Sequence, residues 1–258
     1  MPRITIPKLR KLKGQSKIVM ITAYDAPSAK LVDQAAEIAL VGDSLGTTVQ
    51  GRANTLSVTM EEMIYHTRLV AENTKQALVL GDMPFMSYQS SIKQAVSNAG
   101  RFLKEGQAGA VKLEGGASVI PQVKAIIGAG IPVMGHLGYT PQSVNATGVS
   151  VNRDRDALLD DAKRLEDAGV FAMVLELVPS DVAKEISEAV SMPTIGIGAG
   201  PHCDGQVLVF NDILGFDPSF TPKFLKRYLN FHDLAAKALG EFRDDVRGGA
   251  YPADEHSY

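Results

Sequence analysis

Five apolar runs of this sequence end on a side chain that can carry a charge or transfer a proton. The runs are LVGDS at Asp43, LVLGD at Asp82, VKLEGG at Glu114, VMGH at His136 and MVLEL at Glu176. A buried parallel strand reads as a continuous Val, Ile and Leu run, and ligands bind beyond the carboxyl ends of such strands. If the runs form one barrel, their carboxylates meet at one mouth, where they need a cation, a shared proton or both.

Asp43, Asp82 and Glu114 are the candidate metal ligands, because each follows its apolar run and the three runs are consecutive. Hard oxygen donors suit Mg²⁺, which prefers octahedral oxygen coordination. The sequence has no Cys and His cluster of the kind that binds zinc. Taken singly, each acid also fits an ordinary loop role: Asp43 as a cap through Ser44, and Asp82 as support for the Met83–Pro84 turn.

Glu176 is the candidate general base. It stands between Leu175 and Leu177, in the apolar surroundings that suit a carboxylate working as a proton acceptor near neutral pH. The alternative is a salt bridge inside the barrel with Lys112. Lys112 lies two residues before Glu114, so both side chains point to the same side of one strand.

Lys112 and His136 are the candidate substrate contacts of positive or neutral character. A buried lysine needs an anionic partner, so we expect Lys112 to meet a substrate carboxylate or Glu176. A Schiff base on Lys112 is the weaker interpretation, since a metal would already supply an electron sink. His136 is expected either to make structural hydrogen bonds or to contact the substrate or Glu176.

A glycine-rich segment, Gly196-Ile-Gly-Ala-Gly200, follows a further apolar run. Many barrels bind phosphate on backbone N–H groups at this place. The segment does not match GxGxxG, and its glycines fit a close approach of two backbones equally well.

Strand-like runs alternate with segments of helical periodicity along the chain. The expected strands are Lys17–Ala23, Ile38–Val41, Leu78–Leu80, Ala110–Leu113, Ile131–Met134, Val170–Leu175, Thr194–Ile197 and Val207–Phe210. The expected helices are Ser28–Ala36, Val58–Asn73, Ser91–Glu105, Val119–Ile127, Arg153–Ala168, Asp181–Val190 and Phe224–Val246. Eight strands with intervening helices predict an α/β fold, a (β/α)8 TIM barrel with appended C-terminal helices; an open doubly wound sheet is the alternative.

The length of 258 residues favours a single barrel domain over 1–258, with 1–16 as an N-terminal arm and 221–258 as a C-terminal helical extension. Six positive charges, five of them in the arm and the sixth at Lys17, precede the first acid, Asp25, and the arm fits a solvated or subunit-contacting segment better than a nucleic-acid tail. The net charge of −3 gives no electrostatic basis for nucleic acid or a membrane as partner. A lone cysteine, Cys203, and an N-terminus unlike a signal peptide predict a cytoplasmic protein.

These residues together indicate a reaction class. A divalent cation with free positions chelates the carboxylate and keto oxygens of a 2-oxo acid and acidifies the hydrogen on the neighbouring carbon. A carboxylate then removes that proton, and the enolate adds to an electrophilic carbon. The residues thus predict metal-dependent aldol-type chemistry on a 2-oxo acid and leave the electrophile open.

The order of motifs along the chain resembles that of the ketopantoate hydroxymethyltransferase family. The motifs are Ile21-Thr-Ala-Tyr-Asp25, Val41-Gly-Asp-Ser-Leu45, Asp82-Met-Pro-Phe-Met-Ser-Tyr88, Val111-Lys-Leu-Glu-Gly-Gly116, Gly135-His-Leu-Gly138, Thr140-Pro-Gln-Ser143, Val174-Leu-Glu176, Ile195-Gly-Ile-Gly-Ala-Gly200, Cys203-Asp-Gly-Gln-Val207 and Glu255-His-Ser-Tyr258. The resemblance spans almost the full length. One segment, Asn145–Arg153, departs from it: the family usually has Gly-Gly-aromatic-Lys-Val-Gln-Gly there.

The resemblance implies transfer of a hydroxymethyl group from 5,10-methylenetetrahydrofolate to 3-methyl-2-oxobutanoate, the first step towards pantothenate. It also implies Mg²⁺ held by Asp43, Asp82 and, through water, Glu114, and a homo-oligomer, typically a decamer. Contacts to the 2-oxo acid are expected from Asp43, Ser44, Asp82, Lys112 and His136, with Glu176 as proton acceptor. Two alternatives stay open: a metal-dependent lyase or mutase of the phosphoenolpyruvate-like barrel group acting on another 2-oxo acid, and a non-catalytic barrel kept for binding or assembly.

Overall fold

Eight parallel strands close into a barrel in chain order in this computed structural model, which describes residues 3–258. The strands are β1 (Ile18–Thr22), β2 (Ile38–Val41), β3 (Leu78–Asp82), β4 (Ala110–Lys112), β5 (Val133–Gly138), β6 (Ala172–Glu176), β7 (Thr194–Ile197) and β8 (Gly205–Leu208). The first strand also pairs with the last, with Ile18 beside Gly205 and Ile21 beside Leu208, so the sheet has no free edge. The closed ring confirms the predicted TIM barrel and excludes the open sheet.

The barrel interior is apolar because the strands are Val, Ile, Leu and Met runs covered on both faces. Every residue of β2 and β3 is buried. Met20, Leu40, Leu80 and Met134 from four different strands belong to one core cluster. Burial of such side chains stabilises the fold by about 1.5–3 kcal/mol each. A rigid scaffold of this kind holds the charged side chains that follow the strands.

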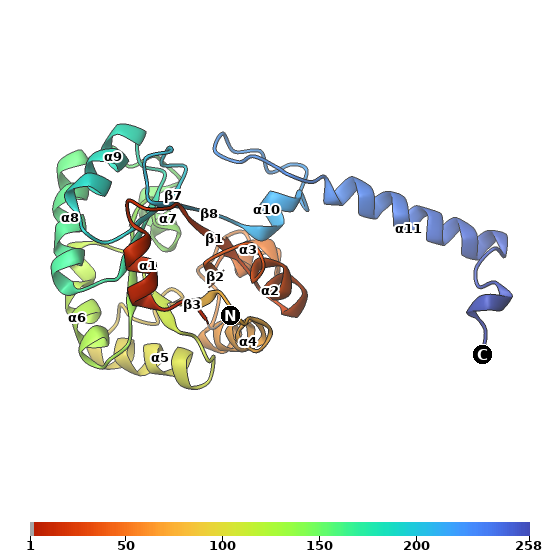
Figure 1. The fold of residues 1–258 in the computed structure, drawn as a ribbon, viewed down its shortest axis with the longest axis horizontal. Coiled ribbons are helices and arrows are strands. Elements are labelled where there is room, and N and C mark those ends of the chain that lie inside the picture. The colour runs from red at the N-terminus through yellow and green to blue at the C-terminus, as the bar shows by residue number, and fades with distance from the viewer. Residues whose placement is uncertain (1–2) are drawn as a thin grey trace. The chain divides into compact units, whose positions relative to one another are not determined.

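Helices surround the strands in the unit formed by the chain up to Val209. They are α1 (Ile6–Leu12), α2 (Ala26–Val32), α3 (Leu45–Thr48), α4 (Met60–Asn73), α5 (Ile92–Lys104), α6 (Ile120–Gly128), α7 (Val144–Thr147), α8 (Arg155–Ala168) and α9 (Ser180–Ala189). Figure 1 shows α4, α5, α6, α8 and α9 as a ring around the strands. The helix ends have ordinary signals: Thr59 and Glu62 form a capping box at the start of α4, and Gly169 ends α8 in a left-handed conformation.

The N-terminal segment forms α1, which crosses the barrel at the end where the strands begin. Leu9 of α1 is 1% exposed and packs in one cluster with Ile18 and Ile38, the first residues of β1 and β2. The segment is fixed at both ends, because the Ile4 N–H donates to Gln76 O before β3 and the Lys13 ammonium binds Asp204 before β8 at 2.7 Å. Part of the expected N-terminal arm is therefore a covering element of the barrel.

Residues 210–258 form a second compact unit with α10 (Phe210–Leu214) and α11 (Phe231–Gly248). Within it, Phe216 and Phe231 stack with ring centroids 4.1 Å apart. None of the helices in residues 3–258 combines the length and apolar character needed to cross a membrane.

Several element ends differ from those that the sequence predicted; the expected helix Ser28–Ala36, for example, is α2 and ends at Val32. The fifth strand was expected to end at Met134, but β5 continues to Gly138 because its pairing with β6 extends to Glu176. The eighth strand begins at Gly205, not Val207, since Gly205 pairs with both β1 and β7. The helix expected from Phe224 begins at Phe231.

Candidate active site

Charged side chains from five consecutive strands meet at the carboxyl end of the barrel. Asp43 and Ser44 follow β2, Asp82 ends β3, Lys112 ends β4 with Glu114 two residues beyond, His136 lies in β5, and Glu176 ends β6. Adjacent-strand pairing puts Asp82 beside Lys112. Apart from Ser44 and Glu176, each of these side chains belongs to a residue that is more than nine-tenths buried. The residues that the sequence singled out thus lie in one contiguous network.

Lys112 forms a buried ion pair with Asp82. Its Nζ lies 2.7 Å from Asp82 Oδ1, and both side chains are at most 5% exposed. The contact is an ion pair rather than a well-aligned hydrogen bond at the carboxylate oxygen. Burial lowers the pKa of Lys112, but the charges of Asp82, Glu114 and Asp43 outweigh it and raise the pKa above the ordinary value. The amine therefore stays protonated, which opposes the Schiff-base interpretation.

His136 lies between two carboxylates. Its Nδ1 is 3.5 Å from Glu114 Oε1 and its Nε2 is 3.2 Å from Glu176 Oε2. Burial and the nearby Lys112 charge lower the pKa of His136, but the close contacts with the Glu114 and Glu176 carboxyl groups outweigh them and raise it to about 9. The imidazole is then a cation at neutral pH. Glu176 thus has His136 as its charged neighbour, where the salt-bridge alternative had named Lys112.

The three candidate metal ligands repel one another. The Asp43 N–H donates to Asp82 Oδ2 at 3.3 Å, which brings the two chain segments together. Burial and the charges of Asp82 and Glu114 raise the pKa of Asp43 well above its ordinary value. Burial also raises the pKa of Asp82, although Lys112 opposes that shift. Burial alone would raise the pKa of Glu114, but His136 and Lys112 together lower it.

Negative charge exceeds positive charge in this network. Asp43, Asp82, Glu114 and Glu176 face only Lys112 and the His136 imidazolium. A bound divalent cation would balance the excess and oppose the raised pKa values. The donors are carboxylate oxygens, the type that Mg²⁺ prefers. Within residues 3–258, no three Asp, Glu, His or Cys side chains are grouped so that they could hold a metal ion by themselves.

Two residues that the sequence analysis did not single out join the network. Gln142, in the turn Pro141–Ser143 after β5, donates to Asp43 and accepts from Tyr88. Burial, followed by the charge of Glu114, raises the pKa of Tyr88 well above its ordinary value, so its hydroxyl remains a donor. Nothing in the spacing of Gln142 points to this role, because it lies beyond the strand in a loop. Only the motif Thr140–Ser143 drew attention to that segment.

Ser44 is held by a tyrosine from the preceding strand's loop. Its Oγ lies 2.8 Å from the Tyr24 hydroxyl oxygen, and His66 Nδ1 lies 2.6 Å from Tyr24 O. Ser44 immediately precedes the short helix α3. The hydroxyl is thus fixed next to Asp43 and partly accessible to a ligand.

The atypical segment 145–153 is attached beside Glu176. The Asn152 N–H donates to Leu177 O at 3.0 Å, and Asn152 Nδ2 reaches Gly138 O at 3.5 Å. Leu177 has φ +48°, an unusual conformation for a leucine that turns the chain sharply after Glu176. Backbone bonds of this type depend little on side-chain identity, so the segment can differ in sequence and keep this attachment.

The glycine-rich segment has a steric explanation. Gly200 has φ +78°, and a side chain there would overlap Ser180, the first residue of α9. The glycine thus allows a close approach of the β7–β8 connection to α9. Phosphate binding by this segment stays a prediction.

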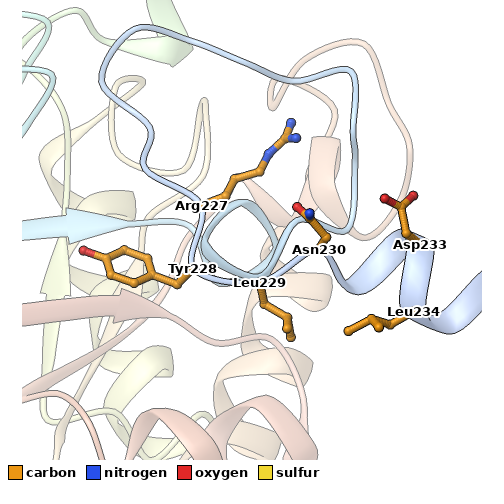
Figure 2. Close-up of a pocket in the computed structure, with 6 residues that line it drawn as sticks. All are labelled: Arg227, Tyr228, Leu229, Asn230, Asp233 and Leu234. Atoms are coloured by element: carbon orange, nitrogen blue, oxygen red, sulfur yellow. The ribbon is translucent and has the colours of Figure 1, made fainter.

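A separate hollow of about 500 Å³ lies in the C-terminal unit. Figure 2 shows Leu229 and Leu234 turned to one side of it, with Arg227, Asn230 and Asp233 turned to the other. It contains none of the barrel carboxylates and has a single acid, Asp233. Its lining therefore offers no general acid and base pair.

The chain matches the family model described as "Ketopantoate hydroxymethyltransferase" over residues 3–254. It is 55% identical to the 3-methyl-2-oxobutanoate hydroxymethyltransferase of Desulforapulum autotrophicum, over 100% of this chain and 99% of that protein. It is 53% identical to the protein of the same name from Moorella thermoacetica, over 99% of this chain and 98% of that one.

Solved structures with the same fold are much more distant in sequence. A 2,3-dimethylmalate lyase of the PEP mutase/isocitrate lyase superfamily superposes with a TM-score of 0.59 at 14% identity, over 98% of this chain and 91% of its own. A phosphonopyruvate hydrolase in complex with oxalate and Mg²⁺ superposes with a TM-score of 0.62 at 13% identity, over 98% and 93%. At such identities the likeness shows the fold alone. The family model and the full-length relatives show more: this chain belongs to the ketopantoate hydroxymethyltransferase family.

Proposed function

We propose that the chain catalyses the reaction for which its family is named, with the site described above as its active centre. A hydroxymethyl group passes from 5,10-methylenetetrahydrofolate to 3-methyl-2-oxobutanoate, and ketopantoate forms. The observation that carries this proposal is the meeting of Asp43, Asp82 and Glu114 in one buried network, with Glu176 next to them across His136.

Asp43 and Asp82 would hold Mg²⁺ directly and Glu114 through water. Such an ion, when bound, polarises the carboxylate and keto oxygens of the 2-oxo acid and makes its C3–H bond more acidic. The excess negative charge and the oxygen donors of the site support this assignment, as does the Mg²⁺ named with the phosphonopyruvate hydrolase of the same fold.

Lys112 and Ser44 would bind and orient the 2-oxo acid. The Lys112 ammonium is already desolvated and directed by Asp82, so a second anion meets it at little further loss of hydration. Ser44, fixed by Tyr24, offers a neutral hydroxyl on the same side as Asp43.

Glu176 would accept the proton from C3. It is the most exposed carboxylate of the four, with 20% of its side chain accessible, and it can therefore reach a substrate. The C3–H electron pair becomes the nucleophile that forms the new bond to the one-carbon unit, and water supplies the hydroxyl group. The two nitrogens that held the one-carbon unit then take the proton removed from C3 and the remaining proton of water, and tetrahydrofolate leaves. His136 Nε2 lies 3.2 Å from Glu176 Oε2 and helps to position that carboxyl group.

A coupled experiment tests the proposal. The protein with Mg²⁺ and 3-methyl-2-oxobutanoate deuterated at C3 is expected to exchange deuterium with water, and addition of 5,10-methylenetetrahydrofolate is expected to give ketopantoate. Exchange without ketopantoate would favour the lyase or mutase alternative. The solved structures support that alternative only by their similar fold. The absence of exchange with any branched 2-oxo acid would favour the non-catalytic barrel.

A homo-oligomer is also part of the proposal. On α11, the apolar side chains of Leu234, Leu239, Phe242 and Val246 are all about half exposed or more within the second unit. Their spacing places them on one side of the helix. Light scattering on the purified protein is expected to give a mass several times 27.6 kDa.

A further inference from the structure

We infer that Gln142 is the positioning residue that orients the Asp43 carboxylate toward a bound cation and links it to Glu114, and that Tyr88 acts through Gln142. The inference rests on the metal site proposed above. It assigns to the turn after β5 the task of fixing the side-chain rotation of the carboxylates. The barrel strands position the backbone of these acids but do not fix that rotation.

Gln142 bonds to both carboxylates by different groups. Its side-chain Nε2 donates to Asp43 Oδ2 at 3.0 Å, and its backbone N–H donates to Glu114 Oε2 at 3.0 Å. Each bond engages one oxygen of a carboxylate, and the rotation of that carboxylate is thereby fixed. The second oxygen of Asp43 is then held in a defined direction, as a metal ligand requires, while the second oxygen of Glu114 faces His136 Nδ1 at 3.5 Å.

The orientation of the Gln142 amide is determined by its partners. Nε2 also donates to Met83 O at 2.9 Å, so both of its hydrogens face acceptors that cannot donate. Oε1 accepts from the Tyr88 hydroxyl at 2.7 Å and from Gln89 Nε2 at 3.0 Å. A flipped amide would place oxygen against oxygen at two contacts. The residue is 5% exposed, and all of its side-chain bonding capacity is used.

Tyr88 ties this arrangement to the β4 end. The phenol is 1% exposed, donates to Gln142 Oε1 and accepts from the Glu114 N–H at 3.1 Å. The three loops that follow β3, β4 and β5 are therefore joined through one amide and one hydroxyl. Pro141, the first residue of the turn, fixes the backbone that presents the Gln142 N–H.

Loss of the Gln142 side chain would release the Asp43 carboxylate from its hydrogen-bond donor and would leave the identity of every proposed metal ligand unchanged. Asp43 would keep its position in the chain and lose its orienting donor, in a site where its charge already faces two other carboxylates. Residues that orient metal ligands typically contribute 10- to 100-fold to metal affinity or activity. We therefore expect a defect in metal binding and in the chemical step rather than in folding alone.

The test compares Gln142→Leu, Tyr88→Phe and the double variant with wild type, and Gln122→Leu on α6 is the control for the same substitution outside the site. Mn²⁺ affinity is measured by electron paramagnetic resonance and C3–H exchange by NMR, with thermal unfolding in chelator to check the fold. Gln142→Leu is expected to weaken Mn²⁺ about 10- to 100-fold, and Tyr88→Phe less. Because Tyr88 acts through Gln142, the double variant should bind no more weakly than Gln142→Leu alone.

Two results would overturn the inference in distinguishable ways. Equal Mn²⁺ affinity in wild type and Gln142→Leu would remove the role of Gln142 and leave the metal site in place. A wild-type protein that binds neither Mn²⁺ nor Mg²⁺ would remove the metal site and this role with it. If Gln142→Leu does not fold, additive effects of Tyr88→Phe and Asp43→Asn on Mn²⁺ affinity would contradict the inference, and non-additive effects would support it.

Discussion

His136 Nε2 lies 3.2 Å from Glu176 Oε2, while the other nitrogen of the same ring faces Glu114. One imidazole thus separates the proposed base from the proposed metal ligands. A general base has to be held within reach of the proton that it removes, and the contact with His136 helps to position the Glu176 carboxyl group. Because His136 lies between them, Glu176 is separated from Asp43, Asp82 and Glu114, which repel one another.

Glu176→Gln is expected to reduce C3–H exchange about 10²- to 10⁴-fold, the usual contribution of a general base. Binding of 3-methyl-2-oxobutanoate should remain, because the amide keeps the shape of the side chain. NMR exchange and calorimetric binding measure the two properties separately. Exchange at the wild-type rate would remove Glu176 as the base.

Lys112→Met is expected to weaken binding of the 2-oxo acid about 10- to 100-fold, the equivalent of a lost charge-assisted bond of about 1.5–3 kcal/mol. Metal affinity should stay the same or rise, since the variant removes a positive charge that pairs with Asp82 and opposes a cation. Calorimetric titration with each ligand provides the measurement.

Lys124→Met, on the exposed side of α6, is the control and should change neither affinity. A parallel loss of metal and 2-oxo acid affinity in Lys112→Met would show that Lys112 organises the whole site instead.

Gly138→Ala is expected to destabilise the barrel by about 1–3 kcal/mol and to lower turnover. Gly138 has φ +99°, and a methyl group there would overlap the carbonyl oxygen of Glu176. Gly100→Ala inside α5, where a methyl group meets no atom within 4 Å, should be neutral or stabilising by about 0.5–1 kcal/mol. Urea unfolding compares the two, and equal stabilities would contradict the predicted overlap.

Glu62→Gln is expected to reduce stability by about 1 kcal/mol at pH 7, the usual effect of losing a helix cap. The bond with Arg52, at 2.6 Å, is the main cause that lowers the pKa of Glu62 to about 2. A folded-state pKa below the unfolded value means that the stabilisation is complete above about pH 4.5 and is lost as the pH falls toward 2. The difference between wild type and variant should disappear over that interval.

Unfolding free energies measured from pH 2 to 7 check this prediction. Glu61→Gln serves as control, because the Glu61 side chain is 74% exposed and should contribute less than about 0.5 kcal/mol. A difference that does not vary with pH would show that the capping hydrogen bonds act independently of charge.

The barrel and most of its charged residues could be predicted from the sequence because both depend on local pattern. A continuous apolar run such as Ile38–Val41 indicates a doubly covered strand, and an acid directly after it, such as Asp43, must face the mouth. The strand ends were harder to place. Gly135 and His136 interrupt the apolar pattern, yet β5 continues through them because β6 provides hydrogen-bond partners from the neighbouring strand.

Partnerships across the site could not be predicted in the same way. The pairing of Glu176 with His136 depends on which side chains face each other across the barrel, and spacing along one strand contains no such information. Gln142 bonds to Asp43 over a separation of 99 residues, from a turn with no periodic signal. The hydrogen-bond partners of neutral side chains in loops can be identified only from the folded structure.

The helix α1 covers the end of the barrel at which the strands begin. Leu9 packs against Ile18 and Ile38, the first residues of β1 and β2, and Lys13 pairs with Asp204 before β8. If the proposed function is correct, both reactants would approach the charged network from the carboxyl ends of the strands.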